Sequence, residues 1–353
     1  MKKSNKYAKN GALIFGLGNS FIELIDQLKD LNKDPNIKFN WNKLLTAAIK
    51  GATVGTVVGF GIGSVRDYHN SQEKLINLNK HLRDLADSLA LDKSSAEFIN
   101  LNNSVNKIIK EFKNHFHKKI KGELIPHGST EKGTALNDSY DIDIAIPFQS
   151  KSFPNNYKMY NEVYKYFDNR INTLNIVDIR KQKRSVGVCV EIKNKEYWID
   201  FAPYKLSKNK SSGYLFVNKS GILFNNSTIQ KTDLSILKKT KFTKVQKHLI
   251  VLLKNWKENE GLNLPSHFLE HLVKDAYRIN KGNIPKSIDK KMIMILEHMA
   301  NRLHIVRING LENTNNKISE SIDESDKQNV VDACKKIIRD YEYQPNSLIA
   351  NFR

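Results

Sequence analysis

The most constraining feature of this sequence is a pair of aspartates, two residues apart, that follows a glycine–serine turn. Residues 127–134 read HGSTEKGT, and Asp141 and Asp143 lie in the run DIDIAI that comes next. Alternate side chains of a β-strand share a face, so the two carboxylates point one way while the intervening isoleucines point into a core. Carboxylates about 6–7 Å apart at their bases suit hard cations such as Mg²⁺, and the turn can offer N–H groups and a hydroxyl to a polyphosphate. The pattern therefore predicts a metal-dependent nucleotidyl-transfer site.

A third carboxylate is expected from a neighbouring strand. Residues 186–192 and 197–204 alternate apolar with other side chains, and residues 193–196 are typical of a hairpin turn between them. Asp200 falls on the face opposite the apolar residues of the second strand, where an acid is costly to bury unless a metal ion compensates it. The alternative is that Asp200 merely ends an edge strand before Pro203.

These motifs resemble the DNA polymerase β-like nucleotidyltransferase superfamily, in which Gly-Ser is followed by Asp-x-Asp and later by a lone aspartate. The closest resemblance is to the branch that holds oligoadenylate synthetases, cyclic GMP-AMP synthase and bacterial CD-NTases. Residues 247–256 (KHLIVLLKNW) resemble the helix that opens the second lobe of these enzymes, and residues 264–270 (LPSHFLE) resemble the start of the next helix. Residues 312–316 and 330–338 resemble the end of that lobe, so the resemblance covers roughly residues 100–340.

The resemblance implies a role for seven residues. The acids that would hold two Mg²⁺ (or Mn²⁺) ions and carry the catalysis are Asp141, Asp143 and Asp200. The residues that would bind the nucleotide triphosphate are Gly128, Ser129, Lys247 and Ser266. For Lys247, an ordinary solvated helix position remains an open alternative.

The resemblance also implies an activity. The enzyme would join NTPs, ATP among them, into a cyclic or short linear oligonucleotide with release of pyrophosphate. This product would be a second messenger for a separate effector, as in bacterial anti-phage defence. One alternative is a template-independent transferase that acts on RNA 3′ ends or on a protein hydroxyl. A non-catalytic scaffold with the same fold is disfavoured, because all three acids are present.

The expected fold class is α+β, in three parts. Residues 1–70 form an N-terminal helical extension, and residues 71–235 form a polymerase β-like nucleotidyltransferase lobe with a mixed sheet. Residues 71–121 of this lobe are expected to be a long helical approach, because apolar residues recur at helical spacing. Residues 236–353 form a helical nucleotide-binding lobe. The nucleotides would lie in a cleft between the sheet and this second lobe.

The N-terminal extension contains a glycine zipper. Within the apolar residues 44–65, glycines recur every four residues at Gly51, Gly55, Gly59 and Gly63. Small residues at this spacing share one side of a helix and let two helices approach closely. A helix hairpin packed on itself or in a homo-oligomer contact is the favoured interpretation. Membrane association is the alternative, although Lys50 interrupts a span that is short for a bilayer of about 30 Å.

Composition sets the remaining expectations. Two cysteines in 353 residues, and no convincing secretory signal, favour a reducing, cytoplasmic compartment. The formal charge of +20, from 57 Lys and Arg against 37 Asp and Glu, favours polyanionic partners such as nucleotides or RNA. Because lysines are spread along the chain, charge alone does not establish RNA binding. Residues 267–271 spell H-x-x-E-H, which is typical of some zinc peptidases, but no third zinc ligand is identifiable in the sequence.

Overall fold

A computed structural model describes residues 77–207, 212–218, 228–232, 241–305, 309–310, 313–317 and 322–352. The glycine zipper of the N-terminal extension lies outside these residues, and so does every other feature expected within residues 1–76. The contacts of the chain separate into Met1–Asn77 and Leu78–Arg353, and the second unit holds the catalytic motifs. Of the helices described, none is both long and apolar enough to cross a membrane.

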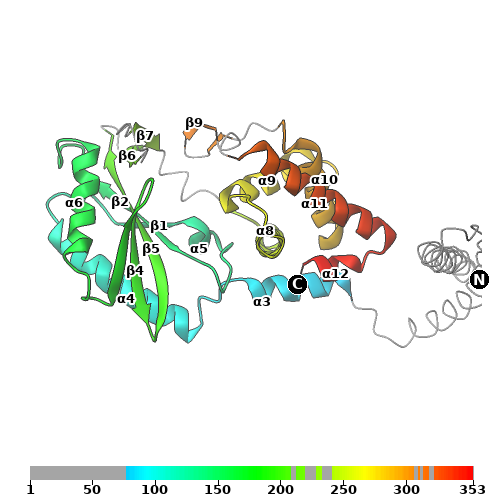
Figure 1. Ribbon diagram of the computed structural model, residues 1–353, viewed down its shortest axis with the longest axis horizontal. Helices are drawn as coiled ribbons and strands as arrows, with labels where there is room; N and C mark the ends of the chain where they lie inside the picture. The colour runs from blue at the N-terminus through cyan, green and yellow to red at the C-terminus, as the bar shows by residue number, and fades with distance from the viewer. Residues whose placement is uncertain are drawn as a thin grey trace, which may run out of the picture. The chain divides into compact units, whose positions relative to one another are not determined.

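The described residues form a seven-stranded mixed sheet (Figure 1). Its strands are β1 (Ile125–His127), β2 (Ile142–Phe148), β3 (Ile176–Lys181), β4 (Val186–Ile192), β5 (Lys195–Leu206), β6 (Gly213–Val217) and β7 (Thr228–Thr232). The central order is β1-β2-β5-β4-β3, with β6 beside β5 and β7 beside β6. Only β2 and β5 pair in parallel, so the chain must cross over between the two strands that carry the acids.

The β4–β5 hairpin is tighter than expected. Lys193 and Asn194 alone form its turn, with φ angles of 52° and 62°, while Lys195 and Glu196 already pair within the sheet. A two-residue turn with two positive φ angles matches the right-handed twist of the strands it joins.

One face of the sheet carries the core of the catalytic lobe. The helices α4 (Ala96–His115) and α6 (Asn156–Asp168) lie on the same side of the sheet in Figure 1 and share one buried apolar cluster with it. The isoleucines of β2 at positions 142, 144 and 146 are buried in this cluster, together with Tyr197, Ile199 and Phe201 of β5. The alternation expected for both strands is therefore confirmed, and the aspartates lie on the opposite face.

The expected long helical approach is two helices. It is divided into α3 (Leu78–Leu89) and α4. Ser95 sets the start of α4, because its side chain accepts a hydrogen bond from the N–H of Phe98. A serine at this position satisfies a free N–H at the start of a helix and so fixes where the helix begins. The apolar side of α3 joins the core of the helical lobe, not that of the sheet.

The second lobe is helical, as expected. Its helices are α8 (Lys244–Asn259), α9 (Ser266–Ile279), α10 (Ile288–Arg302), α11 (Glu324–Tyr343) and α12 (Ser347–Asn351). They bury a common apolar cluster with α3. Thr243 and Gln246 form a capping box that starts α8, which fixes where the lysines of α8 fall on the helix. A two-stranded hairpin, β8 (Asn309–Gly310) and β9 (Asn313–Lys317), interrupts the helices.

Candidate active site

The acids belong to a row of residues that crosses five strands. His127, Asp143, Asp200, Gly187 and Arg180 are successive Cα partners on β1, β2, β5, β4 and β3. The third acid therefore comes from the neighbouring strand, as the sequence predicts. Because paired strands lie roughly 4.8 Å apart, the backbones that carry Asp143 and Asp200 are as close as two strands allow.

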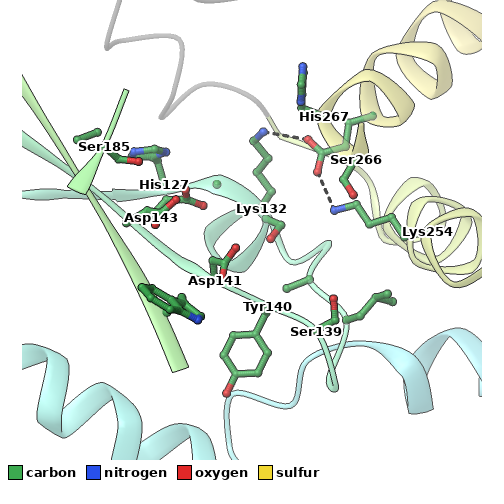
Figure 2. Close-up of a pocket in the computed structure, with 18 of the residues that line it drawn as sticks. His127, Lys132, Ser139, Tyr140, Asp141, Asp143, Ser185, Lys254, Ser266 and His267 are labelled. Carbon is green, nitrogen blue, oxygen red and sulfur yellow. Dashed lines mark hydrogen bonds and ion pairs between the residues drawn. The ribbon is translucent and has the colours of Figure 1, made fainter. Parts of the chain in front are cut away.

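All three aspartates line a single cavity of about 750 Å³. Figure 2 labels two of them, Asp141 and Asp143. Asp141 precedes β2 and lies two residues before Asp143, so the two side chains share a face. Both lobes contribute to the wall of the cavity. Of the residues expected to bind nucleotide, the cavity is lined by Gly128, Ser129 and Ser266.

Burial is the largest cause of the raised pKa of all three aspartates in the cavity. Burial, followed by the charges of Asp200 and Asp141, raises the pKa of Asp143 to about 7. Burial and the charge of Asp141 raise the pKa of Asp200 to about 6, although Arg180 opposes the shift. Burial also raises the pKa of Asp141. Three acids in this arrangement repel one another unless a cation lies among them.

These residues fit a divalent metal ion. Oδ1 of Asp200 is buried and has no hydrogen-bond partner among the described residues, and a buried carboxylate oxygen is stable only when it is paired or bound to a cation. Carboxylate oxygens are the ligands that Mg²⁺ prefers. In the described part of the chain, no three His, Cys, Asp or Glu side chains are already gathered closely enough to hold an ion. Binding would therefore require the three carboxylates to converge.

The glycine of the Gly-Ser turn is required by contact with the acid row. Gly128 has a φ of +77°, and a Cβ atom there would lie 1.8 Å from Oδ2 of Asp143. Gly128 and Ser129 are the first two residues of the short helix α5 (Gly128–Lys132), so the Gly-Ser turn is the first turn of this helix. The hydroxyl of Thr130 donates to the carbonyl of Asp141 at 2.9 Å. The turn and the acid strand are therefore held as one unit, with Ser129 at the cavity wall.

We expect Gly128→Ala to abolish most of the activity of the site, because the new methyl group would displace the carboxylate of Asp143. Gly122→Ala is the matched control, since Gly122 also has a positive φ, +87°, but open space where its Cβ would lie. Each variant should lose about 1–2 kcal/mol of stability from the left-handed backbone, as measured by denaturant unfolding. Only Gly128→Ala should lose turnover; equal activity in both variants would contradict the contact with Asp143.

The lysine expected from the resemblance does not line the cavity. Nζ of Lys247 lies beside Gly133, 3.0 Å from where a Cβ atom on that glycine would be. Lys132 and Lys254 line the cavity instead. Lys254 lies on α8 seven residues after Lys247, which is nearly two full turns and thus the same side of the helix. Of these two lysines of α8, Lys254 is therefore the one whose side chain lines the cavity.

A buried carboxylate joins the two lobes at this point. Glu270 on α9 accepts from Lys132 at 2.9 Å, from Lys254 at 3.2 Å and from the hydroxyl of Thr134 at 2.7 Å. Figure 2 marks both lysine contacts with dashed lines. Lys254 also donates to the carbonyl of Thr134 at 2.9 Å. Glu270 is the acid of the H-x-x-E-H pattern, and here it binds two lysines that border the cavity.

His127 is a further residue that sequence reasoning missed. It stands at the β1 end of the acid row and lines the cavity. Burial, and to a lesser degree the charge of Lys132, lowers its pKa to about 4, so the ring is neutral at physiological pH. Its Nε2 is buried without a hydrogen-bond partner among the described residues. Its place directly before the Gly-Ser turn was the only signal in the sequence.

Comparisons with known proteins agree with this geometry. Residues 105–211 match the family described as Nucleotidyltransferase domain. Among solved structures, the chain is similar to CdnC of E. coli MS115-1 with ATP, at 16% identity and a TM-score of 0.59 over 78% of this chain and 96% of that one. It is also similar to the CD-NTase CdnG of Bradyrhizobium diazoefficiens in complex with GTP, at 11% identity and a TM-score of 0.60 over 79% and 96%.

The Cid1 poly(U) polymerase is a more distant structural neighbour, at 10% identity and a TM-score of 0.53 over 75% of this chain and 94% of that one. No curated protein sequence matches the chain. The family match shows a nucleotidyltransferase domain over residues 105–211, and the structural neighbours share its fold. They also confirm the α+β class, with a mixed sheet and a helical C-terminal region.

Proposed function

We propose that this nucleotidyltransferase joins NTPs into a cyclic or short linear oligonucleotide and releases pyrophosphate. The observation that carries the proposal is the pairing of Asp143 with Asp200 on parallel strands, in one cavity with Asp141 and the Gly-Ser turn. The second-messenger role, a separate effector and a place in anti-phage defence rest on the likeness to CD-NTases. Any oligomer or membrane contact of residues 1–70 and any RNA binding stay predictions.

The donor NTP would bind at the end of the cavity that β1 and α5 form. Ser129, Lys132 and Lys254 line the cavity there and can hold a triphosphate, Ser129 through its hydroxyl and the lysines as point charges. Ser266, at the start of α9, accepts from Lys257 at 3.3 Å and would face the same phosphates. The two lysines that meet Glu270 would then have phosphate oxygens as additional partners.

The three aspartates would hold two Mg²⁺ or Mn²⁺ ions, in keeping with the general use of divalent metals by this superfamily. When bound, such ions activate a ribose hydroxyl and neutralise the charge that develops on the leaving pyrophosphate. The hydroxyl oxygen would form a bond to the α-phosphorus of the donor as the bond to pyrophosphate breaks. Asp200, whose Oδ1 has no hydrogen-bond partner among the described residues, would either accept the proton of that hydroxyl or hold the ion beside it.

The deciding experiment is to identify the product. Purified protein would be incubated with the four NTPs and Mg²⁺ or Mn²⁺, and the mixture separated by chromatography and weighed by mass spectrometry. A small oligonucleotide that resists phosphatase would support the proposal. Nucleotides attached to added RNA or to protein would support the alternative transferase, which the fold of the Cid1 neighbour also fits. Unchanged NTPs under all conditions would refute both.

We expect the two lysines of α8 to behave differently when each is replaced by alanine. Lys254→Ala should raise the KM for NTP roughly 10- to 100-fold, because a charge-assisted contact to the triphosphate is lost. Lys247→Ala should leave the KM within about twofold of wild type, since this half-buried side chain does not line the cavity and substitutions away from a site have small effects. Steady-state kinetics at saturating metal would measure both. If Lys247→Ala raises the KM more than Lys254→Ala does, Lys247 and not Lys254 contacts the triphosphate.

A further inference from the structure

A glycine in the middle of β4 marks the close passage of an arginine. Gly187 is buried, and a Cβ atom there would lie 2.9 Å from Cγ and 3.0 Å from Nε of Arg180. Glycine weakens a strand, and inside one it often marks a site where another group approaches closely. Since Gly187 does not have a positive φ, its backbone does not require glycine. The position is therefore explained by the room it leaves for Arg180 to cross β4.

The guanidinium of Arg180 stacks on an aromatic ring but forms no ion pair with a described residue. Its guanidinium carbon lies 3.8 Å from the centre of the Trp198 ring. Trp198 lines the cavity two residues before Asp200, on the same face of β5. Arg180 is exposed, and its positive charge opposes the raised pKa of Asp141 and of Asp200. No hydrogen bond or ion pair joins its guanidinium to a residue that the structure describes. Its N–H donors are therefore available beside the cavity while the ring fixes their plane.

Arg180 and the Gly-Ser turn lie at opposite ends of the acid row. The turn follows β1, and Arg180 lies on β3, with the aspartates of β2 and β5 between them. In nucleotidyl transfer the attacking and leaving oxygens are roughly in line. A donor triphosphate at the turn therefore leaves the β4–β3 end of the row for the nucleotide that attacks.

We propose that Arg180 binds the phosphate groups of the acceptor nucleotide. The planar guanidinium fork matches two phosphate oxygens at once, Trp198 holds it flat, and Gly187 lets it reach the acid row. This inference rests on the proposed function, because it assumes that an NTP is the acceptor. It adds that the acceptor is recognised through its phosphates at a subsite separate from the two lysines of the donor.

The test separates donor from acceptor chemically. A 2′,3′-dideoxy-NTP can only donate, because it has no ribose hydroxyl, and an α,β-methylene-NTP can only accept, because its α,β bridge is not cleaved. With the donor at saturation, Arg180→Ala should raise the KM of the methylene acceptor roughly 10- to 100-fold. The KM of the plain nucleoside, which accepts without phosphates, should not change. An equal rise for both acceptors, or no rise for either, would overturn the inference.

Two further variants sharpen the result. Arg170→Ala is the matched control, since Arg170 stacks on Tyr166 at 3.7 Å and neither residue lines the cavity; it should match wild type with both acceptors. Gly187→Ala should reproduce part of the Arg180→Ala defect, because the methyl group would push Arg180 aside. If wild type transfers nothing to any acceptor, both the proposed function and this inference are refuted. If wild type transfers normally and Arg180→Ala leaves the KM of both acceptors unchanged, this inference alone fails.

Discussion

Replacement of Asp143 by asparagine is expected to abolish nucleotide transfer and, at neutral pH without metal, to make the protein more stable. The loss of turnover should be about a thousandfold or more, since the charge stabilisation supplied through metal ligands amounts to several kcal/mol. Asparagine keeps the shape of the side chain but removes the charge. The variant should therefore fold while it no longer holds the ions.

The gain in stability follows from the direction of the pKa shift. The pKa of Asp143 in the folded protein is about 7, well above its ordinary value of 3.8, so the folded state holds the proton more tightly than the unfolded state does. The free energy of unfolding of the metal-free wild type should then fall as pH rises from about 4 to about 7, and stay low above that range. The side chain of the Asp143→Asn variant cannot ionise, so the variant escapes this loss, which is on the order of a few kcal/mol.

The measurement is denaturant unfolding of both proteins at pH 8, first with a chelator and then with Mg²⁺. Wild type should be the less stable protein with the chelator and should gain stability with Mg²⁺, whereas the variant should respond weakly. Asp138→Asn is the matched control, because Asp138 lines the same cavity but is exposed and lies outside the acid row. Normal turnover by Asp143→Asn would contradict the proposed mechanism. If Asp143→Asn is less stable than wild type in the presence of the chelator, the acids do not repel one another.

The local parts of this site could be predicted from the sequence because they depend on the two-residue period of a strand. That period alone predicts that Asp143 points to one face of the sheet and the neighbouring isoleucines to the other. In the same way it predicts that Asp200 and Phe201 point to opposite faces. The pairing of β2 with β5 is a contact between distant segments, so the sequence could only indicate that a neighbouring strand supplies the third acid. The break after α3 was missed because the apolar spacing continues on both sides, although Ser95 is a typical helix start.

The choice between two lysines on one helix could not be made from the sequence. Lys247 and Lys254 are seven residues apart and share a side of α8, so their order along the cavity depends on how the lobes pack. The partner of Lys254 is equally remote, because Glu270 lies on another helix and Lys132 lies on the other lobe. The H-x-x-E-H pattern indicates a role for the histidines on either side of Glu270. The lysines that Glu270 contacts, however, come from distant parts of the chain.

Loss of the Glu270 carboxylate should be the most destabilising single change in the site. Glu270→Ala would leave Lys254, whose side chain is only 5% exposed, without a counter-charge in a buried position. Breaking a buried ion pair by removing one partner costs about 3–5 kcal/mol. Turnover should fall as well, because both lysines that we propose to hold the triphosphate lose the group that fixes them at the cavity. Thermal and denaturant unfolding would measure the loss of stability.

An exposed ion pair provides the control. Lys93 and Glu131 are 2.9 Å apart, the same distance as Lys132 and Glu270, but both side chains are nearly half exposed. Glu131→Ala should therefore cost no more than about 1 kcal/mol. If Glu270→Ala costs as little as Glu131→Ala, burial does not strengthen the contact between the lobes.

A double variant distinguishes the buried charge from the lost hydrogen bonds as the cause. Replacing Glu270 and Lys254 together by methionine removes both charges and keeps most of the volume, and such changes are often close to neutral.

The pH dependence of the stability of Glu270→Ala gives a second criterion. Burial already lowers the pKa of Lys254 below its ordinary 10.5, and Glu270→Ala removes the partner that opposes this shift. A lysine with a lowered pKa in the folded state destabilises the protein while it is charged, and this penalty shrinks as pH rises toward 10.5. The deficit of Glu270→Ala should therefore narrow at high pH, whereas a deficit caused by lost hydrogen bonds alone would not.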